Sequence, residues 1–138
     1  MAFTGNVTCN SFKTGLMNGS FDFSTDTFYI ALYTNAATLD YSTTAYTTTG
    51  EVVASGYAAS PLTVTVTPTT GGSGTVSYIS FSNVSWTAAF TARGALIYKP
   101  GANGAVCVLD FGSDKTSTTT FTVQFPAATN TSAIIRIA

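Results

Sequence analysis

The sequence predicts an all-β fold, an antiparallel two-sheet sandwich or jelly-roll-like domain with seven or eight strands and one short N-terminal helix. Thr and aromatic residues are abundant, and they favour the pleated, half-exposed surfaces of strands. The apolar segments are short and are separated by turns rich in Gly, Pro and Asn, which is typical of sandwiches and barrels. At 138 residues the chain has the length of one domain, which we place at residues 1–138.

The centre of the predicted fold is a hairpin of two apolar segments, Ala92–Tyr98 and Ala105–Phe111, around a Pro-Gly-Ala-Asn-Gly turn. Nearly continuous apolar runs are typical of strands that are covered on both faces. Each segment holds one charge, Arg93 or Asp110, and burying either charge alone would cost several kcal/mol. We therefore predict that Arg93 and Asp110 form a structural ion pair, with a functional site as the alternative.

The segment 10–19 carries the only helical pattern of the chain. Asn10 or Ser11 suits the N-cap position, and Gly19 suits the position after the helix. The apolar residues of this segment form one stripe that is expected to lie on the sheet: Phe12, Leu16 and Met17.

The segment Thr27–Tyr33 predicts a strand with an aromatic second face. Phe28, Ile30 and Leu32 share one face, and Tyr29 and Tyr33 share the other. This second face and an apolar fraction of 45% predict that copies of the chain associate, most simply as a homotrimer.

Residues 35–60 are polar and have little periodicity, which predicts a long loop with at most one short strand at Glu51–Ala54. Such long loops are usually functional or are ordered by a partner. The N-terminal arm, residues 1–10, also holds apolar residues without a period. We therefore expect both segments to contact a partner and to become ordered by that contact. The candidate interface residues are Phe3, Tyr29, Tyr33, Tyr41, Tyr46 and Tyr57.

The remaining strands alternate with turns. The predicted strands are Leu62–Thr67, Val76–Phe81, Thr120–Phe125 and Ala133–Ile137, and the predicted turns are Gly71–Gly74, Gly112–Thr118 and Pro126–Thr131. Asn83 marks a bulge or bend, because the apolar parity changes there. We assign Trp86, the single tryptophan, to core or subunit-interface packing, with a sugar-binding platform as the alternative.

The residues that carry chemistry are few. The chain has no His, which excludes Ser-His-Asp and Cys-His nucleophiles and His-based metal sites. Asp22 with Asp26, or Asp110 with Asp114, could lie close enough for glycoside hydrolysis, but Asp beside Ser, Thr and Gly is usually a turn former. We predict no enzymatic activity, no catalytic residue, no cofactor and no metal.

Charge and cysteine usage add three expectations. The net charge of −1 predicts no nucleic-acid partner, and the absence of long apolar runs predicts no membrane partner. Cys9 and Cys107 lack metal-ligand spacing and are expected to be reduced thiols packed as small apolar groups. The first residues lack a signal-peptide pattern, so we expect folding in a cytoplasm.

Five segments carry a resemblance to a known family: LMNGSFDFSTDTFYIALYT (16–34), GY (56–57), VSWTAAFTARGALIYK (84–99), VLDFGSDKTSTTTFTVQFPA (108–127) and AIIRI (133–137). Their succession resembles a family of small virion proteins of tailed bacteriophages. The segments span nearly the whole chain, and their motifs are structural rather than catalytic. The chain departs from many relatives in its middle loop, which is rich in Thr and Tyr where theirs is acidic.

The resemblance implies a non-enzymatic structural protein of the virion. Our first expectation is a capsid decoration (cement) protein that bridges major capsid subunits. The alternatives are a tail, neck or fibre component and, third, a carbohydrate-binding module for host attachment. The implied partners are the major capsid protein or other virion proteins, together with further copies of the chain. The implied location is the virion, assembled in the host cytoplasm.

Overall fold

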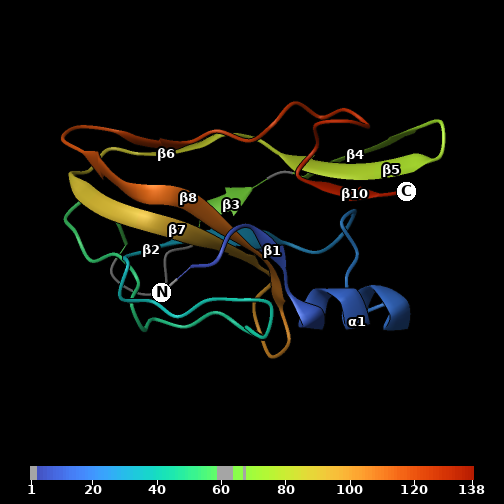
Figure 1. Cartoon of the computed structure of the whole chain (residues 1–138), viewed down its shortest axis with the longest axis horizontal. Helices are drawn as coiled ribbons and strands as arrows, with labels where there is room; N and C mark the ends of the chain where they lie inside the picture. Colours follow the sequence, from blue (N-terminus) through green and yellow to red (C-terminus); the bar gives the residue numbers. More distant parts are fainter. Residues whose placement is uncertain (1–2, 59–63, 67) are drawn as a thin grey trace.

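A computed structural model describes residues 3–58, 64–66 and 68–138 of the chain (Figure 1). The elements in chain order are β1 (Val7–Thr8), α1 (Asn10–Asn18), β2 (Phe28–Tyr33), β3 (Val64–Val66), β4 (Pro68–Ser73), β5 (Val76–Phe81), β6 (Val84–Trp86), β7 (Phe90–Tyr98), β8 (Ala105–Ser117), β9 (Phe121–Val123) and β10 (Ile135–Ile137). The predicted all-β class, with antiparallel sheets and one short helix, is confirmed. The strands of the described residues outnumber the predicted seven or eight, because β1 and β4 come from segments expected to be an arm and a turn, and β6 is a separate strand after the bend expected at Asn83.

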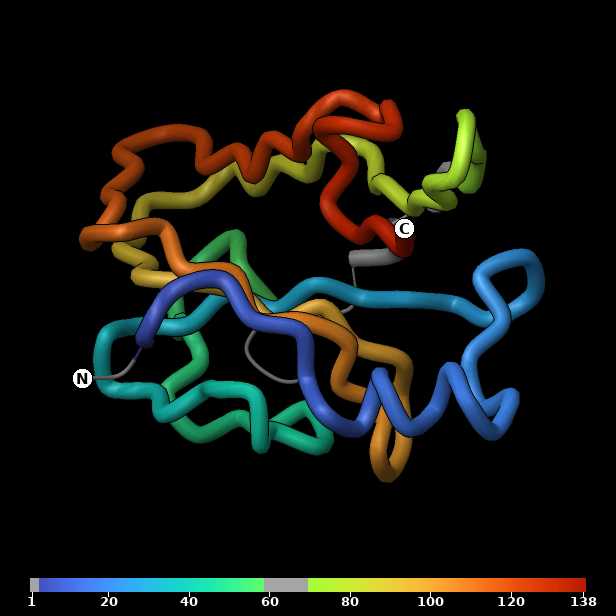
Figure 2. The backbone as a smooth tube through the Cα atoms, turned by 45° about the vertical axis from the view of Figure 1, so that its right-hand side comes forward, coloured from blue at the N-terminus to red at the C-terminus, as the bar shows by residue number. Residues whose placement is uncertain are grey.

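The strands form one large sheet and two small ones, and none of these closes into a barrel in the part of the chain that is described. The large sheet has the order β1-β8-β7-β2-β3, and the small sheets have the orders β10-β5-β4 and β6-β9. Figure 1 shows the small sheets side by side over one face of the large sheet, which we call the inner face. The loop after β2 runs along the opposite, outer face (Figure 2).

The predicted central hairpin is present and is longer than expected. β7 pairs with β8 from Phe90↔Ser117 to Tyr98↔Ala105, so most of the turn predicted at Gly112–Thr118 is strand instead. The pairing has one large irregularity, because Ala92 faces Lys115 while Gly94 already faces Asp110. Arg93 therefore stands opposite four residues, 111–114, which form a bulge. The polar residues of this bulge explain why the segment was predicted to be a turn.

The hairpin continues beyond the large sheet. β6 leads into β7 and β8 leads into β9, and β6 pairs with β9 from Val84↔Val123 to Trp86↔Phe121. Both arms of the hairpin thus pass side by side from the large sheet into the second layer, at the left of Figure 1. We call residues 84–123 the folded ribbon.

Two apolar clusters cover the two faces of the large sheet. The inner cluster includes Ile97 of β7 and Trp86 of β6, and the outer cluster includes Leu96 of β7 and Leu39 of the loop. Leu96 and Ile97 are both fully buried. This explains why the β7 sequence is apolar without alternation: both of its faces are covered.

Helix α1 differs in detail from its prediction. Cys9 occupies the N-cap position without a side-chain hydrogen bond, and Gly19 ends the helix in the left-handed conformation with φ 77°. Phe12 is buried as expected, but Leu16 and Met17 are 38% and 83% exposed. The helix meets the end of the sheet rather than lying across it, so only one narrow face of α1 is covered (Figure 1).

The strands and the turn predicted over Leu62–Phe81 also differ from the structure. β4 pairs with β5 along its full length, and the chain reverses at Gly74 and Thr75 instead of over Gly71–Gly74. The predicted strand Leu62–Thr67 lies partly outside the described residues, and its described part, β3, pairs with β2 rather than with β5.

Candidate interaction site

The loop over residues 34–57 is held to the sheet by a buried carboxylate. Glu51 is 5% exposed, and its carboxylate accepts hydrogen bonds from the hydroxyls of Tyr46 at 2.6 Å and Tyr57 at 2.9 Å. The Tyr57 hydroxyl in turn accepts the backbone N–H of Leu32 on β2 at 2.9 Å. Burial raises the pKa of Tyr57 far above its ordinary value, so this hydroxyl stays protonated and keeps donating. Tyr46 packs on the outer cluster and Tyr57 belongs to the inner one, so Glu51 links the two clusters at the edge of β2.

The six candidate interface residues divide into two groups. The structure buries Phe3, Tyr33 and Tyr57 in the chain's own core, each at most 4% exposed, so these three were wrongly placed at an interface. The reason is that the N-terminal segment and the loop cover the outer face and the β2 edge themselves. Tyr41 is 57% exposed, whereas Tyr29 and Tyr46 are half-buried beside Tyr98.

The N-terminal segment is part of the large sheet. β1 pairs with β8, and the Phe3 ring lies where a Cβ on Gly94 would come within 2.4 Å of it. Asp110 organises this corner: its carboxylate pairs with Arg93 Nη2 at 3.2 Å and accepts the N–H of Gly5 at 2.9 Å. The ion pair predicted from the sequence is therefore present, and it also fixes the N-terminal segment.

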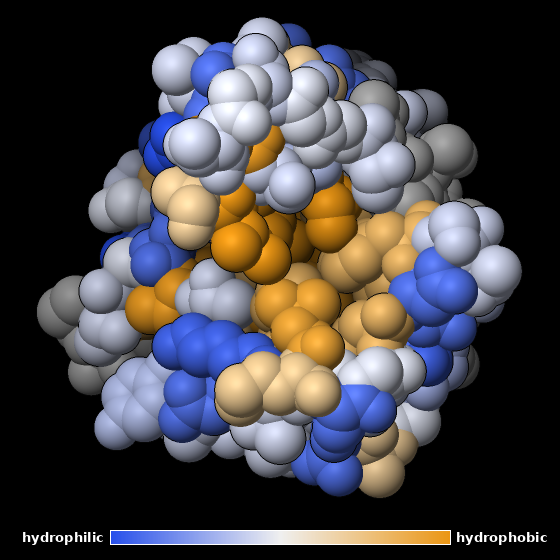
Figure 3. Space-filling view, turned by 90° about the vertical axis from the view of Figure 1, so that its right-hand side faces the viewer, coloured by the Kyte–Doolittle hydropathy of each residue, from blue (hydrophilic) through white to orange (hydrophobic). Residues whose placement is uncertain are grey.

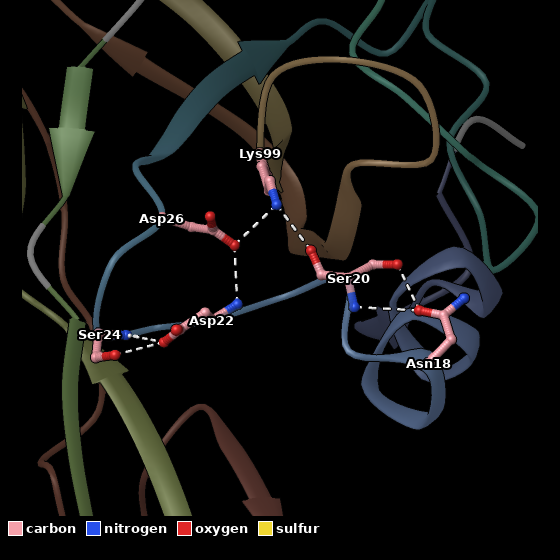
Figure 4. Close-up of polar contacts among 6 residues, drawn as sticks. All are labelled: Asn18, Ser20, Asp22, Ser24, Asp26 and Lys99. Atoms are coloured by element: carbon pink, nitrogen blue, oxygen red, sulfur yellow. Dashed lines mark hydrogen bonds and ion pairs between the residues drawn. The ribbon is translucent and has the colours of Figure 1, made fainter.

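A second polar cluster ties α1 to the end of β7 (Figure 4). Its members are Asn18, Ser20, Asp22, Ser24, Asp26 and Lys99. The Lys99 ammonium donates to the Ser20 carbonyl at 2.7 Å and to Asp26 Oδ2 at 2.8 Å. The hydrogen bond from Lys99 holds the pKa of Asp26 below its ordinary value. Asp22 and Asp26 therefore act here as ionised turn and ion-pair residues, an arrangement without the raised-pKa acid of a glycosidase.

Apolar side chains remain partly uncovered where the two layers meet. Figure 3 shows them gathered in a hollow at the end of the molecule that carries α1 and the β4–β5 hairpin. A groove of about 450 Å³ runs between β1 and β8 on one side and the β9–β10 region on the other. Its apolar lining includes Leu109, Phe111, Phe125 and Ile134, all half-buried against the inner cluster. This groove is the candidate interaction site.

The described residues offer little reactive chemistry. They contain no group of three or more His, Cys, Asp or Glu side chains that could share a metal ion. Cys9 and Cys107 are buried free thiols, and burial raises the pKa of Cys9 to about 11, which disfavours the reactive thiolate. Trp86 is 5% exposed and packs beside Tyr57 and Phe121, so it is a core residue and not a sugar platform. Within the described ranges the longest helix has nine residues, too few to cross a membrane.

Sequence reasoning did not find the groove. Its lining comes from four separate parts of the chain, and each side chain alone reads as an ordinary core residue of its strand. Leu109 and Phe111 are two residues apart, which places them on one face of the predicted strand, but this spacing is equally typical of an ordinary core.

No protein-family model, curated protein or solved structure matches this chain.

Proposed function

We propose that this chain is a non-enzymatic virion structural protein of a tailed bacteriophage, a capsid decoration protein that bridges neighbouring major capsid subunits. The finer fold assignment is part of the proposal: an antiparallel sandwich in which the large sheet is one layer and the two small sheets form the other. The five-segment sequence resemblance supports the virion assignment. The structural observation that carries the proposal is the apolar groove between β1–β8 and β9–β10.

The groove suits contact with another protein. Partly exposed apolar side chains gain free energy when a partner covers them, and they need no charge to be desolvated. The charged residue of the groove lining, Asp110, is already paired with Arg93 within the chain. The major capsid protein and further copies of this chain are the proposed partners, with a trimer as the proposed assembly.

A tail, neck or fibre position is the second candidate, because the same sequence resemblance also implies it. Host attachment through carbohydrate is the third. The feature that favours it is the stack of Tyr29, Tyr98 and Tyr46, with ring centroids 5.8 and 4.8 Å apart, beside a hollow of about 360 Å³. Flat aromatic faces of this kind also suit the apolar faces of sugars.

The test is binding of the purified chain to phage particles that lack it, followed by a particle map. Decoration predicts many copies distributed over the head, whereas a tail component predicts a few copies at the tail. Gln124→Lys places a charge on the exposed rim of the groove and should weaken particle binding by about tenfold. Thr131→Lys, exposed but outside the groove lining, is the matched control and should bind normally. A chain that associates with no part of the particle contradicts the proposal, and glycan binding instead favours the third candidate.

A further inference from the structure

The open edges of the sheets differ in length and protection. Within the described residues, five strands are only two or three residues long: β1, β3, β6, β9 and β10. Such short edges give a partner strand little to pair with. β8 extends past β1, but this part carries the 111–114 bulge and the charges of Asp114 and Lys115. Bulges and charges are the usual devices that prevent an edge from pairing with another chain.

β4 is the exception. It pairs in an unbroken register with β5, from Pro68↔Phe81 to Ser73↔Val76, and no described strand lies on its other side. Its six residues include no charge and no bulge, and Thr70 and Gly72 are exposed. An edge of this kind presents backbone N–H and C=O groups to any extended strand that can align with them.

The turn of the hairpin fixes which groups face outward. Gly74, with φ 62°, begins a two-residue reversal between Ser73 and Val76, and such hairpins close on a hydrogen-bonded pair. Because bonding alternates along an antiparallel ladder, the N–H and C=O groups of Thr70 and Gly72 point away from β5. Pro68 alternates in step with Thr70 and Gly72, so its missing N–H would point outward. It therefore ends the outward row of backbone groups and removes no hydrogen bond to β5.

We propose that β4 pairs antiparallel with β4 of a second copy, across a two-fold axis near Gly71, so that two three-stranded sheets become one of six strands. A second copy fits this edge for two reasons. β4 is longer than the other terminal strands of the described sheets, so its best match in length is itself. A two-fold contact also sets each strand against its own sequence, and an uncharged strand meets no like charge there.

This pairing does not rest on the virion assignment. A two-fold contact at β4 is compatible with a three-fold contact elsewhere, in which case trimers associate in pairs. The pairing therefore predicts masses that double with concentration, from monomer to dimer or from trimer to hexamer.

Light scattering on the purified chain and on two lysine variants tests the proposal. Gly72→Lys adds a charge on the edge, and the folded chain accommodates it because a Cβ at Gly72 lies 3.5 Å from its nearest neighbour, the Val76 carbonyl oxygen. The matched control is Ser77→Lys, an exposed position paired with Gly72 but on the central strand β5. We expect the mass to double with concentration in the wild type and in Ser77→Lys. Gly72→Lys should raise the dissociation constant by about tenfold or more, because the two lysines then lie diagonally across the axis on one face, each opposite Thr70 of the other copy.

Amide hydrogen exchange gives a second readout that does not depend on the added charge. In a concentration series, the amides of Thr70 and Gly72 should become protected as the mass doubles, while that of Gly71 is already protected by β5. Thr70→Pro removes one outward N–H and should abolish the doubling. The proposal is overturned by a mass that never doubles, by doubling that Gly72→Lys leaves unchanged, or by Thr70 and Gly72 amides that exchange equally fast at all concentrations.

Discussion

The two faces of the large sheet are covered by different kinds of structure. Strands cover the inner face with large apolar side chains, such as Phe81 and Phe121, whereas residues 34–50, which form no helix or strand, and Phe3 of the N-terminal segment cover the outer face. The loop has no strand ladder, so side chains add to its isolated backbone hydrogen bonds: Glu51 holds its end to β2, and the half-buried Arg93–Asp110 pair holds the N-terminal segment. The difference shows that a loop can serve as a layer of the core when side chains supply the missing hydrogen bonds.

The largest expected effect tests whether the two covers are equally tight. Leu96→Ala opens a cavity on the outer face, and Ile97→Ala opens one on the inner face, beside each other on β7. Each should lower the free energy of unfolding by about 2 to 5 kcal/mol, measured by urea denaturation. A cost below about 1 kcal/mol for Leu96→Ala alone would show that the loop is a loose cover.

The Arg93–Asp110 pair should come next. Arg93→Ala should lower the free energy of unfolding by about 2 to 3 kcal/mol, because Asp110 stays mostly buried without its counter-charge but keeps the Gly5 and Gly112 amides. The amides of the N-terminal segment should exchange faster in the same variant. An unchanged melting temperature would mean that the pair contributes nothing to holding this segment.

The Glu51 network should have a somewhat smaller effect. Glu51→Ala removes the acceptor of two tyrosine hydroxyls and should cost about 1 to 3 kcal/mol. Hydrogen exchange should rise at Val52, whose N–H is bound to the Leu32 carbonyl beside the network. Glu51→Gln, which keeps the shape and one acceptor oxygen, is the control and should be milder. Equal costs for both variants would show that packing, not hydrogen bonding, holds the loop.

The smallest effect belongs to the exposed ion pair of Lys99 and Asp26. Its side chains are 32% and 21% exposed, so Lys99→Ala should cost less than about 1 kcal/mol. The pKa of Asp26 is lowered in the folded chain, so its contribution is present above its ordinary pKa and is lost as the pH falls through the folded value. Lys99→Ala should raise the pKa of Asp26 in an NMR titration of its carboxyl group. A pKa that does not move would contradict the bond drawn in Figure 4.

The sequence predicted the parts of the fold that are determined by the pattern of apolar residues and by the positions of charged residues. The central hairpin and the Arg93–Asp110 pair could be found because two apolar runs flank one turn and each contains one charge. The strand β4 could not, since Thr-Gly-Gly-Ser reads as a turn; only its partner β5 makes it extended, with Tyr78 lying over Gly71.

The candidate site was harder to predict than the fold. Tyr33 was assigned to an interface from the aromatic second face of its strand, and Tyr57 from its place in a loop without periodicity, but both hydroxyls instead hold the loop to the chain's own core. The sequence nevertheless contains one indication: an apolar β7 without alternation requires a cover on both faces, and the chain has too few further strands to form two covering layers. The loop was the remaining candidate for the second cover. The groove depends on how distant segments meet, which no local pattern encodes.

The folded ribbon has a consequence for the order in which the chain folds. Residues 84–123 contain strands of both layers on the two sides of the β7–β8 turn. Their strand pairs can therefore form one after another, beginning next to that turn. The pairing of β2 with β7 and that of β10 with β5 join residues that are farther apart in the sequence, and closing longer loops costs more chain entropy. We therefore expect the ribbon to be formed in the folding transition state and the N-terminal segment to dock afterwards. In stopped-flow kinetics, Ile97→Ala should mainly slow folding and Phe3→Ala should mainly speed unfolding; the reverse pattern would place the nucleus elsewhere.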